Sequence, residues 1–267
     1  MIAFEKVSAI ALNTFRETVR DKIVYAFMLF TFIITLLSLL LGSLSVGQDV
    51  RILGDIGLAA ISCIGGMVAL FAGTNLVYKE LERRTIYIIF TKPVSGWQFI
   101  AGKFIGLVAC VFIVVAAMGL FLALLAWLIH PEHSSSSLVS TIVEIAAPVG
   151  LVFLELIFVT ALATFFSTFS TPLMSMLFTL SLWLIGHCGD SLRQLGQLSQ
   201  NPGFAKFSSV VYFLLPDLAS LTRVRSLLLY GRQAGSEIIA YITCYVFAYV
   251  LVLLVLSSMI TERKEFS

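Results

Sequence analysis

The stretch FIGLVACVFIVVAAMGLFLALLAWLI, Phe104–Ile129, contains no charged or polar side chain other than one cysteine and one tryptophan. A helix needs about 20 residues to cross the roughly 30 Å hydrocarbon core of a bilayer, and this run is longer than that. It therefore predicts a transmembrane helix.

The rest of the chain has the same character. Of 267 residues, 59% are hydrophobic and only 12% are charged, and the mean hydropathy is +1.02. Soluble domains carry about 25% charged residues, so this composition excludes an ordinary soluble enzyme or a disordered chain. The net charge of +2 is too small for a nucleic-acid-binding protein. We therefore expect an all-α, polytopic membrane protein.

Charged residues divide the chain into long uncharged stretches, each of which predicts a span. The longest, 156–189, is interrupted by Ser167–Pro172, and Pro172 suits the first turn of a new helix. Adding 142–155 on its other side makes two spans of it. We predict six transmembrane helices, at 23–44, 55–78, 100–129, 142–167, 172–189 and 237–260, within one domain covering 1–267. Lys and Arg are more frequent on the side of the two termini, which predicts that both termini are cytoplasmic.

Two segments outside the spans have distinctive patterns. Residues 1–22 place Phe4, Leu12 and other apolar residues on one helical face and charged residues on the opposite face, which predicts an interfacial helix. It serves either as a simple anchor or as an elbow that also contacts a cytoplasmic subunit. In the outer segment 190–236, the apolar run 207–215 is too short to span. It predicts re-entrant or interfacial helices, with a plain loop as the alternative.

The cytoplasmic segment 79–99 follows the second span. Its charged residues should continue that helix, and a short helix ending before Pro93 should follow. Ser95 and Gln98 then form a Ser-x-x-Gln capping box for the third span. The alternative is a solvated hairpin. Residues 96–103 resemble a phosphate-binding loop but lack its spacing and its Ser or Thr, so we expect neither a nucleotide site nor enzyme activity in this chain.

These residues resemble a known family. The pattern Glu82-Arg83-Arg84-Thr85, Thr91-Lys92-Pro93-Val94-Ser95, Phe99 and Gly102-Lys103 is similar to that of permease subunits of type-2 ABC exporters. The outer stretch 212–218, Tyr-Phe-Leu-Leu-Pro-Asp-Leu, resembles the subgroup labelled copper-enzyme maturation permeases.

The resemblance implies a homodimer of permeases in a bacterial inner membrane, driven by two copies of a cytoplasmic subunit that binds ATP and Mg²⁺. This chain would then need no cofactor of its own. It would export a substrate or transmit mechanical work to an outer partner through 190–236. The segment 79–99 would act as a coupling helix that docks on the ATPase subunit. The implied docking residues are Glu80, Glu82, Arg83, Arg84, Thr85, Ile86, Tyr87 and Phe90.

Glu155 is the one acid well inside a predicted span, where a charge is costly, so it should face protein or water. Three roles are open: a hydrogen-bond partner between helices, a lining residue on a path for polar cargo, or a proton-coupling carboxylate. The last role defines an alternative function, an ion-coupled secondary transporter or channel. Another alternative is a membrane scaffold that moves an outer partner.

We expect no metal site and no disulfide framework. The four cysteines are far apart in the sequence. His187, Cys188 and Asp190 could suggest copper together with Met174 and Met176, but the two groups lie toward opposite ends of one predicted helix, in which Met174 and Gly189 are more than about 20 Å apart. The small residues Gly65, Gly66 and Gly73 predict close helix packing within the fold.

Overall fold

In the computed structural model, the described residues are 2–43, 49–82, 95–129, 138–189, 203, 218–230 and 235–265. Throughout this part of the chain the regular structure is helical, which confirms the all-α prediction. The helices are α1 (Ile2–Val19), α2 (Lys22–Ser43), α3 (Asp49–Glu82), α5 (Gly96–Ile129), α6 (Leu138–Ser167), α7 (Pro172–His187), α10 (Leu218–Leu229) and α11 (Ser236–Glu265).

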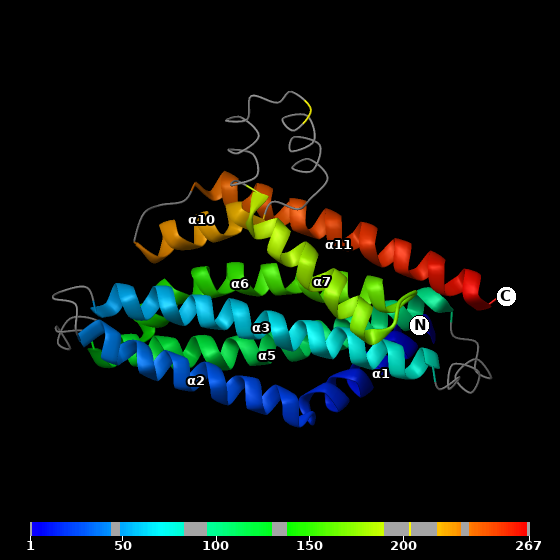
Figure 1. Ribbon diagram of the computed structural model, residues 1–267, viewed down its shortest axis with the longest axis horizontal. Coiled ribbons are helices and arrows are strands. Elements are labelled where there is room, and N and C mark those ends of the chain that lie inside the picture. Colours follow the sequence, from blue (N-terminus) through cyan, green and yellow to red (C-terminus); the bar gives the residue numbers. More distant parts are fainter. Residues whose placement is uncertain are drawn as a thin grey trace.

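The long helices lie side by side along the long axis of the molecule (Figure 1). Five helices, α2, α3, α5, α6 and α11, are long and apolar enough to cross a membrane. The two chain ends lie at the same end of the bundle, where α3 ends and α5 begins (Figure 1). The termini, the end of α3 and the start of α5 therefore lie on the same side of the bundle, in agreement with the predicted topology.

The helix α7 differs from the other predicted spans. It begins at Pro172, with Thr171 as its N-cap residue, which confirms the predicted break after Ser167. It contains 16 residues, and at 1.5 Å per residue it is about 24 Å long. This length is too short to cross the hydrocarbon core alone. The count of six complete spans therefore stays a prediction.

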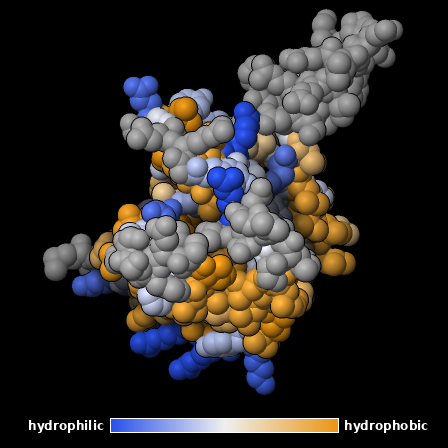
Figure 2. Space-filling model, turned by 90° about the vertical axis from the view of Figure 1, so that its left-hand side faces the viewer, coloured by the Kyte–Doolittle hydropathy of each residue, from blue (hydrophilic) through white to orange (hydrophobic). Residues whose placement is uncertain are grey.

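Large apolar side chains cover the outside of the bundle. Phe30, Phe112, Leu128, Leu184 and Leu251 are each about half exposed or more. Seen from the end where α3 begins, a broad hydrophobic surface lies along the side of the molecule (Figure 2). A soluble protein rarely exposes so much contiguous apolar surface, whereas a bilayer solvates it.

Glycines bring neighbouring helices into close contact at the predicted positions. An added Cβ at Gly65 would lie 2.7 Å from Leu156 of α6, and one at Gly73 would lie 2.7 Å from the Ala163 Cβ. Both distances are shorter than any ordinary carbon contact. The prediction that these glycines pack helices within the fold is confirmed, because α3 could not approach α6 this closely with larger residues.

A second pair of glycines holds α1 against α5. Gly102 and Gly106 are four residues apart and lie on one face of α5. An added Cβ at Gly102 would lie 3.0 Å from the Val7 carbonyl oxygen, and one at Gly106 would lie 2.4 Å from that of Ala11. The amphipathic helix is confirmed, but its apolar face is divided. One edge, with Thr14, packs against protein, while Phe4 on the other edge is 80% exposed.

Candidate functional site

The carboxylate of Glu155 lies at the centre of a polar cluster inside the helix bundle. The residue is only 1% exposed. Its oxygens accept hydrogen bonds from Ser62 Oγ at 3.1 Å and from Trp183 Nε1 at 2.9 Å. Three helices, α3, α6 and α7, meet at this one acidic side chain. A buried charge is stable only when it is paired and hydrogen-bonded, which is the case here.

Two basic side chains complete the cluster. His187 Nε2 lies 3.3 Å from Glu155 Oε1, and Arg225 Nη1 lies 3.8 Å from Glu155 Oε2. The other ring nitrogen of His187, Nδ1, lies 3.1 Å from the Trp183 carbonyl oxygen. The Trp183 and His187 rings are perpendicular, with centroids 5.7 Å apart. We call Glu155, Ser62, Trp183, His187 and Arg225 the Glu155 cluster.

The local sequence explains how α7 contributes two members. Trp183 and His187 are four residues apart, so they lie on the same face of the helix. Gly66 of α3 makes room for the indole, because an added Cβ there would lie 2.6 Å from Trp183 Cη2. The indole N–H therefore reaches Glu155 only because the facing residue on α3 has no side chain.

Arg225 comes from α10, in the segment predicted to lie outside the membrane. This helix buries Leu218, Leu221 and Val224 and contacts α6, α7, α3 and α11. It lies toward the end of the bundle where α3 begins, whereas α7 extends toward the other end (Figure 1). The alternative of a plain outer loop is therefore wrong for 218–229. The helices α7 and α10 follow each other along α6 and meet at Glu155.

The C-terminal end of α10 has its own contact with α3. The Tyr230 hydroxyl donates a hydrogen bond of 2.6 Å to Asp55 Oδ2, and the Arg51 guanidinium lies 5.7 Å from the centre of the Tyr230 ring. The hydrogen bond to Asp55 and the charge of this carboxylate raise the pKa of Tyr230 above its usual value. Arg225 and Tyr230 thus attach α10 to the bundle at two points.

Sequence reasoning found part of this cluster. It singled out Glu155 as an acid that faces protein or water, and it named His187, although as a rejected metal ligand. It missed Ser62, Trp183 and Arg225. The four-residue spacing of Trp183 and His187 was the available signal. Arg225 had no comparable signal, because a charged residue between predicted spans is ordinarily exposed.

The implied ATPase-docking residues fall mostly outside the described residues. This applies to Arg83, Arg84, Thr85, Ile86, Tyr87 and Phe90. Glu80 and Glu82 lie in the last turn of α3, which continues past the predicted span end at Tyr78, as expected. At the other side of the segment, the Ser95 N–H donates to Gln98 Oε1 at 3.4 Å, and α5 begins at Gly96. This contact is one half of the predicted capping box.

The possible metal ligands are dispersed in the described part of the chain. Within them, no three His, Cys, Asp or Glu side chains come together in a way that could hold a metal ion. The predicted separation of His187 from Met174 holds, because α7 is one continuous helix with Met174 in its first turn. Asp190 lies outside the described residues.

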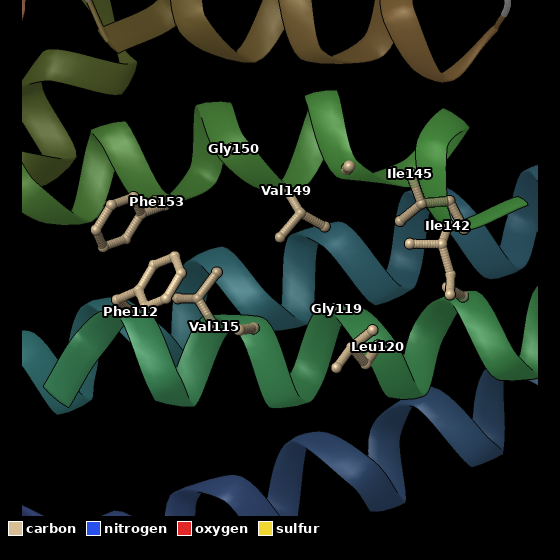
Figure 3. Close-up of a pocket in the computed structure, with 12 residues that line it drawn as sticks. Phe112, Val115, Gly119, Leu120, Ile142, Ile145, Val149, Gly150 and Phe153 are labelled. Carbon is tan, nitrogen blue, oxygen red and sulfur yellow. The ribbon is translucent and has the colours of Figure 1, made fainter. Parts of the chain in front are cut away.

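A groove of about 290 Å³ lies between α5 and α6. Phe112 and Phe153 face each other at one end, and Gly119 faces Val149 further along (Figure 3). An added Cβ at Gly150 would meet nothing within 4 Å, so this glycine widens the groove. The lining is carbon almost throughout, so the groove offers no group that could bind a charged cargo.

The fold and the Glu155 cluster define a multi-pass membrane protein whose helices are joined around a buried carboxylate. The sequence model of the family described as "ABC-2 family transporter protein" matches residues 8–265. The chain therefore belongs to this family and is the membrane-spanning permease subunit of an ABC transporter. Permeases of this family are transporter subunits, not catalysts, and typically pair with ATP-binding subunits. The match is to the family as a whole, so the subgroup resemblance stays a prediction. No curated protein sequence matches the chain significantly.

Proposed function

We propose that this permease couples ATP hydrolysis on separate cytoplasmic subunits to movement of its helices. The observation that carries the proposal is the family membership of nearly the whole chain. Two permease copies and two ATPase subunits would form the complex, in a bacterial inner membrane with both termini in the cytoplasm. The resulting motion would export a substrate or do mechanical work on an outer partner.

The ends of α3 and α5 support a lever-like role for the segment between them. The helix α3 continues to Glu82 without a break. The helix α5 starts immediately after Ser95, whose backbone N–H donates to the Gln98 side chain. A force applied to a docked coupling helix would therefore reach two long helices directly. Because Gly102 and Gly106 fasten α1 to α5, the amphipathic helix would move with them.

The geometry of Glu155 supports an interhelical role over a cargo path. Its partners come from α3, α7 and α10, and the Glu155 side chain is only 2% exposed. A carboxylate that binds a permeating cation would instead leave oxygens facing an open path. The ion-coupled alternative predicts that the purified chain alone moves cargo when an ion gradient is applied, and the ATPase-driven function predicts that it does not.

Docking is tested by co-expressing the chain with a candidate ATP-binding subunit from the same genome. A photo-crosslinking residue at position 87 should capture that ATPase. We expect Tyr87→Ala to uncouple transport from ATP hydrolysis more than Lys79→Ala does, because buried apolar anchors outweigh exposed charges, which contribute about 0–1 kcal/mol. Equal effects of the two substitutions, or no capture at position 87, would count against the docking of this segment.

A further inference from the structure

The ring of His187 has an oxygen atom facing each of its nitrogens. Nδ1 lies 3.1 Å from the Trp183 carbonyl oxygen. A carbonyl oxygen only accepts, so Nδ1 must carry a hydrogen and donate it. The opposite nitrogen, Nε2, lies 3.3 Å from Glu155 Oε1. With Nδ1 protonated, a neutral imidazole would present its Nε2 lone pair to a carboxylate oxygen.

Two lone pairs facing each other in a buried site repel, so one further hydrogen has to lie between Nε2 and Oε1. If it sits on Nε2, the pair is an imidazolium and a carboxylate. If it sits on Oε1, the pair is a neutral imidazole and a carboxylic acid. Both forms contain the same number of protons. We propose that Glu155 and His187 together form a binding site for one proton, and that this proton fastens α7 to α6.

The surroundings of the pair are defined by the helices packed on α6. Ser62 and Trp183 donate to the same carboxylate, and they do not titrate in the physiological range. Arg225 of α10 supplies a fixed positive charge, and Asp55 of α3 acts on Arg225 in turn. The helices α5 and α11 also pack against α6. In the described part of the chain, they place no acidic or basic side chain in contact with the pair.

The two partners differ in how much of each side chain is exposed at the surface of the bundle. The His187 side chain is 30% exposed, whereas that of Glu155 is 2% exposed. His187 is also the last residue of α7. Protons therefore enter and leave through the imidazole, from the side where α7 ends. When the proton leaves, the contact between the last turn of α7 and the middle of α6 turns from attractive to repulsive.

Trp183 provides a direct optical probe of this proton. The chain has three tryptophans, so Trp97→Phe with Trp127→Phe leaves Trp183 as the single emitter. Its indole N–H donates to Glu155, and its ring contacts His187. The full chain, purified in lipid nanodiscs, is titrated between about pH 4 and 10. We expect one pH-dependent change in emission.

The variants separate this proposal from a merely structural contact. His187→Gln should abolish the transition. Glu155→Gln should move its midpoint to lower pH by about 1–3 units, because the neighbouring negative charge is gone. The matched control Cys188→Ser should leave it unchanged. A transition that survives in His187→Gln, an unmoved midpoint in Glu155→Gln, or no transition at all would overturn the proposal.

A second measurement covers the case in which the tryptophan replacements prevent folding. His130→Gln with His133→Gln leaves His187 as the single histidine, since the chain has three. The ¹⁵N chemical shifts of its ring then report which nitrogens carry hydrogen. A neutral ring with hydrogen on Nε2 alone would overturn the proposal. Neither experiment needs an ATPase subunit, so each outcome is independent of whether the coupling function is correct.

Discussion

Replacing Gly106 by alanine tests whether α1 is held on α5 by direct backbone contact. The added Cβ would lie 2.4 Å from the Ala11 carbonyl oxygen and 2.8 Å from Thr14 Cβ, whereas ordinary contact begins at 3.4 Å. The helix α1 would therefore have to move away by about 1 Å. No side-chain rotation relieves the contact, because the opposing oxygen belongs to the backbone.

The size of the effect follows from two opposing contributions. Overpacking of this kind costs about 1–3 kcal/mol. Alanine is a better helix former than glycine by about 0.8–1.0 kcal/mol. We therefore expect Gly106→Ala to lower the free energy of unfolding by up to about 2 kcal/mol. Gly150→Ala is the matched control, because an added Cβ there meets nothing within 4 Å. It should raise the free energy of unfolding by about 1 kcal/mol.

The assay is equilibrium unfolding of both variants in mixed detergent micelles, with the unmodified chain alongside. A disulfide between cysteines placed on facing residues of α1 and α5 reports whether α1 has moved. If Gly106→Ala proves as stable as Gly150→Ala and forms this disulfide at the original rate, the close contact between α1 and α5 does not exist as described.

Three further predictions concern the remaining contacts. Glu155→Leu should cost about 3–5 kcal/mol in unfolding free energy, because it leaves Arg225 buried without its partner; Glu155→Gln should cost less, and similar losses for both would argue against the charge pairing. The raised pKa of Tyr230 means that its bond to Asp55 is fully present below the ordinary phenol value of 10.0 and is lost as pH rises through the raised value. Tyr230→Phe should therefore remove one component above the ordinary phenol value from the tyrosinate absorbance titration, and an unchanged titration would contradict this. Phe4→Trp should be quenched more strongly by lipids brominated near the headgroup than by lipids brominated at the chain end, if the exposed edge of α1 lies in the interface.

Much of the fold could be predicted because uncharged runs and helix length are local properties. The uncharged runs that form α2, α3, α5, α6 and α11 are long. Each of them therefore predicts a transmembrane helix without any knowledge of the helices that pack against it. The division at Ser167–Pro172 was also local, since proline favours the first turn of a helix. What could not be predicted was the arrangement of α7 and α10, because neither has the length of a complete span.

Two residue patterns were misleading for physical reasons. Arg225 counted as an outer basic residue in the charge census, although it is paired with Glu155 inside the bundle. The excess of Lys and Arg on the side of the termini is therefore larger than the sequence indicated. The stretch Gly102-Lys103-Phe104-Ile105-Gly106 was considered only in part, its first two residues as members of a failed phosphate loop and of the family pattern. Its four-residue glycine spacing is a helix-packing pattern, and the structure shows that α1 is the packed partner.

The short length of α7 also bears on how this chain is made. A 16-residue helix enters the hydrocarbon core poorly by itself, while α6 brings in a carboxylate that costs about 2.5–3.5 kcal/mol at mid-membrane without partners. During synthesis, α6 leaves the ribosome before α7, and α10 follows later still. Glu155 therefore enters the bilayer before its two basic partners, His187 and Arg225, have been synthesised. A chain interrupted before residue 225 would leave this acid incompletely paired, and membrane quality-control proteases would have a reason to remove it.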